Sequence, residues 1–179
     1  MRDFVKNVSV LFLITSIFTF ILAGANLLTK DVVALAQAQR RALAMNFVLP
    51  LADVFSETII LESLSYNVGF EGRDPVGAVM EINVRGYSPD MILLVGIDLS
   101  GAVAGLQILS HGETPGLGDR IENEAWKAQF IGGTRPISRQ VDSISGATVS
   151  VEAVFRAVDR AILHLQENIL PNINDYSPQ

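Results

Sequence analysis

The stretch from Val8 to Leu28 contains no charged side chain and is mostly apolar, and it constrains this chain more than any other feature. A helix that crosses a bilayer needs about 20 such residues. Arg2 and Lys6 precede the stretch, so the positive-inside rule favours a cytoplasmic N-terminus. We therefore expect residues 1–30 to form a transmembrane anchor.

A cleaved signal peptide is the alternative interpretation of the same stretch. Ala23, Gly24 and Ala25 resemble a signal-peptidase site. The apolar stretch is, however, longer than the roughly 7–15 residues that are typical of a signal peptide. This length favours a retained anchor.

The segment after the apolar stretch is rich in alanine and has no glycine or proline between Lys30 and Asn46. Such a composition favours a helix, which should end before Pro50. We expect residues 31–50 to be a helix that connects the anchor to a domain over residues 51–179.

Composition excludes several classes of function. The net charge is −6 and no basic run is present, which argues against nucleic-acid binding. There is no cysteine, so disulfides, cysteine-bound iron–sulfur clusters and thiol nucleophiles are excluded. The two histidines, His111 and His164, are far apart in sequence, which argues against a histidine-rich metal site. Redox work by this chain would need an organic cofactor.

The domain shows strand patterns followed by a helical pattern. Val76–Val84 alternates apolar and polar residues, whereas Ile92–Ile97 and Val103–Leu109 are mainly apolar. Turn residues separate these segments, which predicts a mostly antiparallel meander. An apolar stripe at helical spacing follows from Val151 to Ile169. We expect an α+β fold with flanking helices.

The polar segment Asp142–Ser150 leads directly into that last helix. The first amide groups of a helix lack intrahelical partners and carry partial positive charge, so they bind anions. Ser150 is the expected N-cap, and Thr148 offers a hydroxyl at the entrance. Taken alone, the segment is most simply an ordinary loop and cap.

A second glycine-containing segment runs from His111 to Gly118. Pro115 and Gly116 suit the two central positions of a type II turn. Asp119 follows as an expected N-cap of a short helix. By itself this segment also predicts only a turn.

Other familiar chemistries find no support in the sequence. No Ser/His/Asp arrangement or paired-carboxylate site suggests itself. The glycines form neither a dinucleotide-binding GxGxxG after a strand nor a P-loop with its lysine.

Together, the apolar N-terminus, His111–Gly118 and Asp142–Ser150 resemble the FMN-binding domain of ion-translocating electron-transfer complexes. Its nearest members are the G subunit of the Rnf ferredoxin:NAD oxidoreductase and the C subunit of the sodium-translocating NADH:quinone oxidoreductase. The resemblance implies that a flavin transferase joins FMN to Thr148 through a phosphoester. It implies further FMN-binding residues: Tyr87, Glu113, Thr114, Pro115, Gly116, Leu117, Gly118, Ser145, Gly146, Ala147 and Ser150.

The resemblance also implies a biological setting. The chain would be an electron-transfer subunit, not catalytic alone, of a complex that couples ferredoxin and NAD chemistry to Na⁺ or H⁺ transport. Its partners would be membrane, iron–sulfur and flavin subunits, the flavin transferase and membrane lipid, with no metal site of its own. It would cross the inner membrane once, with the FMN domain outside the cytoplasm. The alternatives are the quinone-reductase C subunit, a membrane-anchored flavin-binding sensor, or an interaction subunit with an unmodified threonine.

Overall fold

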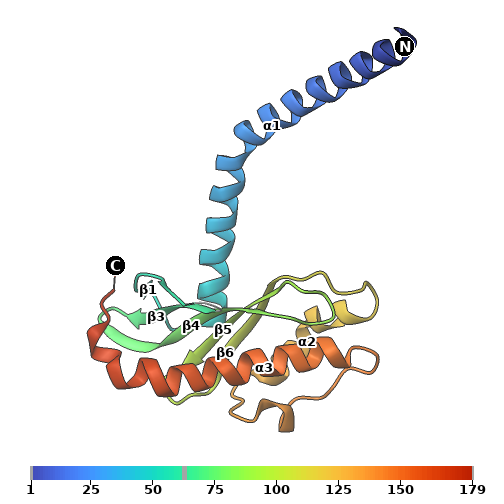
Figure 1. Ribbon diagram of the computed structural model, residues 1–179. Coiled ribbons are helices and arrows are strands. Elements are labelled where there is room, and N and C mark those ends of the chain that lie inside the picture. Colours follow the sequence, from blue (N-terminus) through green and yellow to red (C-terminus); the bar gives the residue numbers. More distant parts are fainter. Residues whose placement is uncertain (1, 62–63, 179) are drawn as a thin grey trace. The chain divides into compact units, whose positions relative to one another are not determined.

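The computed structural model describes residues 2–61 and 64–178, which fall into two compact units, residues 1–42 and 43–179. One helix, α1 (Arg2–Val48), makes up the first unit and contributes its last residues to the second (Figure 1). The expected division at residues 30 and 50 stays a prediction. The expected anchor and domain ranges include Met1, residues 62–63 and Gln179, which lie outside the described residues.

The apolar part of α1 has the length and composition of a membrane-spanning helix. Asn7–Leu27 is long and apolar enough to cross a bilayer, with a mean hydropathy of 2.3. The hydroxyl of Thr15 donates to the Leu11 carbonyl at 3.0 Å, and that of Thr19 donates to the Thr15 carbonyl at 2.8 Å. These bonds satisfy polar groups that hydrocarbon could not. The expected N-terminal apolar helix is confirmed.

The second unit is built on an antiparallel sheet, as expected. In the described part of the chain its strand order is β1-β3-β4-β5-β6, and β2 also pairs with β3. All pairs are antiparallel. The strands are β1 (Val54–Phe55), β2 (Ile59–Ile60), β3 (Leu64–Glu71), β4 (Asp74–Val84), β5 (Met91–Asp98) and β6 (Val103–Ser110).

Helices follow the sheet in sequence. The long helix α3 (Thr148–His164) continues as η4 (Leu165–Ile169). Together, these two elements cover the expected apolar stripe. The shorter elements are η1 (Gly118–Glu122), α2 (Glu124–Lys127), η2 (Ala128–Phe130), η3 (Ile137–Arg139) and η5 (Leu170–Asp175). The expected α+β class with flanking helices is confirmed.

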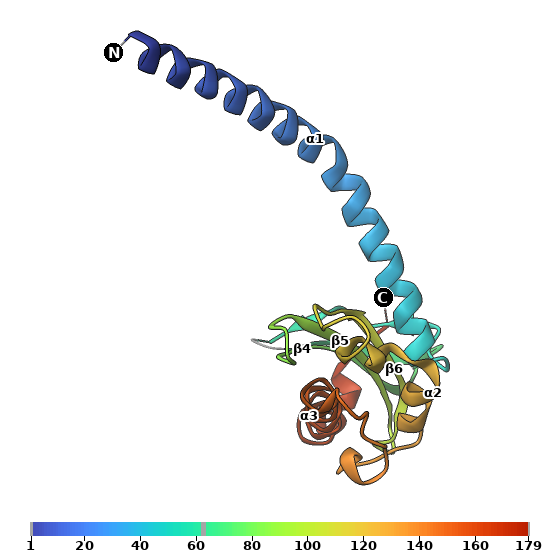
Figure 2. The ribbon, with the colours of Figure 1, turned by 90° about the vertical axis from the view of Figure 1, so that its right-hand side faces the viewer.

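The main core lies between α3 and one face of the sheet (Figures 1 and 2). Alternation along β4 produces this arrangement, because Met80 and Ile82 point into the main core while Val79 points to the opposite face. On that opposite face, Val79 packs in a smaller cluster with Val48 and Leu49. The sheet is therefore covered on both faces near its centre.

Two paired glycines allow the end of α1 to lie against the sheet. Gly96 on β5 pairs with Gly105 on β6. A Cβ atom on Gly96 would lie 2.0 Å from the Val48 carbonyl oxygen, and one on Gly105 would lie 2.5 Å from the Val48 Cα atom. Only glycine fits so close a backbone approach.

The short helix after η1 begins differently from the sequence expectation. Asp119 does not cap a helix, and η1 has no side-chain cap in the described structure. Instead, the Asn123 side chain accepts a hydrogen bond from the Trp126 amide at 3.1 Å and caps α2. The expectation for Asp119 was wrong because the chain first makes a separate 3₁₀ turn.

Candidate functional site

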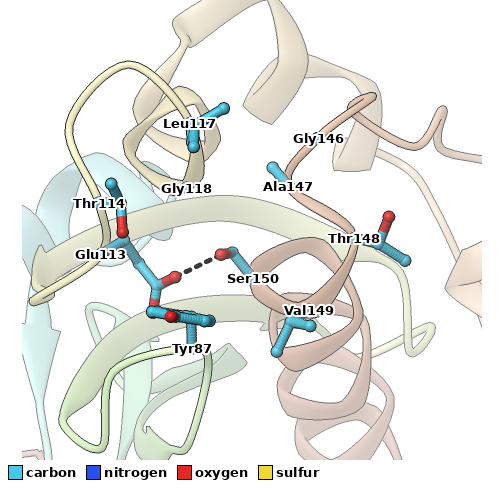
Figure 3. Close-up of a pocket in the computed structure, with 10 residues that line it drawn as sticks. All are labelled: Tyr87, Glu113, Thr114, Leu117, Gly118, Gly146, Ala147, Thr148, Val149 and Ser150. Carbon is cyan, nitrogen blue, oxygen red and sulfur yellow. Dashed lines mark hydrogen bonds between the residues drawn. The ribbon is translucent and has the colours of Figure 1, made fainter.

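A pocket of about 460 Å³ lies where three loops meet at the start of α3. Figure 3 shows the ten residues that line it. They come from the turn after β4, the loop after β6 and the entrance of α3: Tyr87, Glu113, Thr114, Leu117, Gly118, Gly146, Ala147, Thr148, Val149 and Ser150.

The entrance of α3 is shaped by backbone bonds. Gly146 takes a φ of 84°, in the left-handed region that favours glycine. The Ala147 amide then donates to the Ile144 carbonyl at 3.0 Å, and the Val151 amide donates to the Ala147 carbonyl at 2.9 Å. Within the described chain no side chain caps this helix. Its first amide groups therefore remain available to an anion.

Ser150 does not cap α3, contrary to the sequence expectation. The helix begins at Thr148, so Ser150 is its third residue. Its side chain is only 2% exposed, and its hydroxyl donates a hydrogen bond to the Glu113 carboxylate (Figure 3). The expectation was wrong because the helix begins two residues earlier and a buried acceptor on the loop after β6 engages the hydroxyl.

The Glu113 carboxylate links the three walls of the pocket. It is 5% exposed, and its Oε1 atom accepts a hydrogen bond from the Ser88 amide at 3.1 Å. Its Oε2 atom accepts from the Ser150 hydroxyl. Cβ atoms on Gly86 and Gly118 would lie 2.4 Å and 2.7 Å from the carboxylate oxygens. These two glycines therefore leave the space that the carboxylate fills.

The loop after β6 contains the expected tight turn. Gly116 has a φ of 78°, as the third position of a type II turn requires. The Leu117 amide donates to the Thr114 carbonyl at 3.1 Å and closes the turn. The turn presents Leu117 with half of its side chain exposed at the pocket.

The pocket combines apolar surface with an exposed hydroxyl. Tyr87 is 75% exposed, and Leu117 and Val149 are each 50% exposed. Thr148 is also exposed, and in Figure 3 its side chain points away from Glu113. Large apolar side chains held open around a cavity suit a flat aromatic ligand.

Two side chains outside the pocket hold the loop before α3. Arg120 donates from Nη1 to the Ser145 carbonyl at 3.1 Å, and Trp126 donates from Nε1 to the Asp142 carbonyl at 2.7 Å. Trp126 also packs edge-on against Phe130, with ring centroids 4.9 Å apart. The loop that leads to Thr148 is thus tied to η1 and α2.

Comparison with known proteins identifies the family of this chain. Residues 86–163, which include the whole pocket lining, match the FMN-binding domain family. The G subunit of the ion-translocating oxidoreductase complex of Aliivibrio fischeri is 31% identical over 162 residues, covering 75% of this chain and 77% of that protein. The chain belongs to this G-subunit family.

Other members and one solved structure are also similar. The corresponding G subunit of Photorhabdus laumondii is 32% identical over 174 residues, with 83% of each chain covered. The crystal structure of Shewanella oneidensis NqrC aligns at a TM-score of 0.47 and 20% identity, covering 63% of this chain and 66% of that one.

The pocket of this G-subunit family member unites most, but not all, of the residues singled out in the sequence. Pro115, Gly116 and Ser145 do not line it and instead shape its loops. Val149 lines the pocket but was not expected to, although it lies between the expected residues Thr148 and Ser150. Arg120 and Trp126 were missed as loop tethers, because no local pattern marks a contact 16 to 25 residues away.

Proposed function

We propose that this chain is the electron-carrying subunit of an Rnf-type complex and bears FMN joined through its phosphate to Thr148. One observation carries the proposal. Thr148 is an exposed hydroxyl at the uncapped start of α3, on the rim of a 460 Å³ pocket within the FMN-binding domain. The alternative of a quinone-reductase C subunit is less well supported, because the relatives that cover most of the chain are named as G subunits.

The entrance of α3 suits the phosphate of such an ester. A phosphodiester retains one negative charge, and the free amide groups and dipole of a helix start favour an anion. No lysine, arginine or histidine lines the pocket among the described residues. The helix start is therefore the positive element nearest to Thr148 within the pocket.

The rest of the pocket suits the ring system. Tyr87, Leu117 and Val149 offer exposed apolar surface that could pack against isoalloxazine. FMN would supply the redox chemistry, while the chain's own residues bind and orient it. Because the chain lacks cysteine, thiolate-bound iron–sulfur clusters would belong to partner subunits.

The proposed setting follows from the apolar helix and the family. We place α1 across the inner membrane, with a cytoplasmic N-terminus and the FMN domain outside the cytoplasm. A flavin transferase would attach the cofactor. A single spanning helix cannot enclose an ion path, so the Na⁺ or H⁺ path would lie in other membrane subunits.

The attachment is tested with Thr148→Val, compared with Thr134→Val as the matched control. Thr134 is also exposed but does not line the pocket. Full-length proteins are co-produced with a flavin transferase and run on a denaturing gel under ultraviolet light. We expect fluorescence in the wild type and Thr134→Val, and none in Thr148→Val. Fluorescence that persists in Thr148→Val would falsify the assignment.

A further inference from the structure

We propose that Glu113 holds a fixed negative charge beside the flavin and lowers the midpoint potential of that flavin. This inference rests on the proposed function. It gives a role to a buried acidic side chain that lines the pocket but has no part in attaching the cofactor.

The position of Glu113 is built into the fold. Its carboxylate is fixed by two donors from separate segments, the Ser88 amide and the Ser150 hydroxyl. The Glu113 amide in turn donates to Nδ1 of His111 at 3.1 Å, which orients the start of the loop. A carboxylate held by donors from two separate segments, on a backbone that is itself hydrogen-bonded, is fixed in place beside the pocket.

The groups around the Glu113 carboxylate do not cancel its charge. Both donors, the Ser88 amide and the Ser150 hydroxyl, are neutral groups, so neither adds an opposing charge. In the described part of the chain no ion pair involves Glu113. The nearby His111 ring lies 3.0 Å from Glu122, and Arg120 bonds the Ser145 carbonyl. The charge of Glu113 therefore acts on the pocket.

The effect on the flavin follows from Coulomb's law. Adding electrons to the isoalloxazine ring adds negative charge unless protons accompany every electron. A carboxylate in the same pocket repels that charge, and the repulsion is stronger where protein replaces water. Reduction becomes less favourable, so the midpoint potential falls.

The test replaces the charge while keeping the shape, using Glu113→Gln. Its matched control is Glu152→Gln on α3, which removes the same charge from a side chain that is 62% exposed and outside the pocket. Midpoint potentials are measured by spectroelectrochemical titration of the flavin-loaded full chain in detergent. We expect a positive shift for Glu113→Gln and a much smaller one for Glu152→Gln, because water and salt screen exposed charges. An unchanged or more negative potential for Glu113→Gln overturns the proposal.

A second measurement covers the case in which Glu113→Gln carries too little flavin to titrate. The wild-type potential should lie below that of free FMN in the same buffer. A value equal to or above that of free FMN also overturns the proposal. Gel fluorescence distinguishes failure of the proposed function from failure of the role proposed for Glu113. A wild type without attached flavin contradicts the proposed function. Attached flavin with an unmoved potential contradicts only the role of Glu113.

Discussion

The hydroxyl of Ser150 donates a hydrogen bond to the carboxylate of Glu113, which joins the first turn of α3 to the loop after β6. The two residues are 37 positions apart, and both side chains are at most 5% exposed. This bond connects the two sequence motifs that resemble a flavin site. It sets the distance between the Pro115–Gly116 turn and Thr148.

Removal of that donor should loosen the domain. Ser150→Ala leaves a buried carboxylate with one donor fewer, which we expect to cost about 1.5–3 kcal/mol of unfolding free energy. Urea unfolding of the full chain in detergent can be followed through Trp126, the single tryptophan. Ser143→Ala, at an exposed position in the loop before α3, is the control and should change stability by less than about 0.5 kcal/mol. Equal stability of the two variants would mean that the Ser150 bond adds nothing.

The turn at Gly116 should tolerate asparagine better than valine. A Cβ atom there meets no atom within 4 Å, so the cost comes from its φ of +78° alone. We expect Gly116→Val to lose more than about 1–2 kcal/mol and to load less flavin, because β-branched residues resist this conformation. Gly116→Asn should keep more of both, since asparagine adopts positive φ more readily. Flavin fluorescence on the gel and urea unfolding measure the two effects. Equal loading by both variants would contradict this account.

The contact between the end of α1 and the sheet should depend on Gly96. Gly96→Ala would place a methyl group 2.0 Å from the Val48 carbonyl oxygen, which must then move. We expect a loss of about 1–3 kcal/mol or more in the unfolding free energy. Gly24→Ala is the control, because nothing lies within 4 Å of its Cβ position and alanine favours a helix. A fully stable Gly96→Ala would contradict so close an approach.

His164 should make the domain less stable in mild acid. Burial, followed by the nearby Arg160, lowers the pKa of His164 below its usual range, although Glu167 acts in the opposite direction. Its ring also packs edge-on against Tyr66, with centroids 5.3 Å apart. A lowered folded-state pKa means that the neutral form is stabilised by folding. This stability is present above about pH 6.5 and is lost as the pH falls through the folded-state value.

His164→Asn should therefore flatten the pH dependence of unfolding between about pH 7 and pH 5. The readout is the slope of the unfolding free energy with pH, which is separate from any constant loss caused by the substitution. An identical slope in the variant and the wild type would show that His164 is not the source of the pH dependence.

Local features of the sequence determined the class of the fold. The apolar stretch before Lys30 predicted a membrane-type helix, because length and hydropathy alone decide whether a segment suits a bilayer. Alternation in Val76–Val84 and the turn residues between strands predicted the antiparallel meander, since the side-chain period of a strand is local. The Pro115–Gly116 turn was also predictable, because its conformation depends on those two residues.

Only the tertiary structure decided which groups meet. The sequence could not show that the Ser150 hydroxyl donates to Glu113 instead of capping the helix, because that bond depends on a partner 37 residues away. It also could not show that Gly96 makes room for Val48, since an isolated glycine in a strand pattern has several explanations. Motifs in the sequence identified the residues of the pocket except Val149, but long-range packing placed them around one cavity.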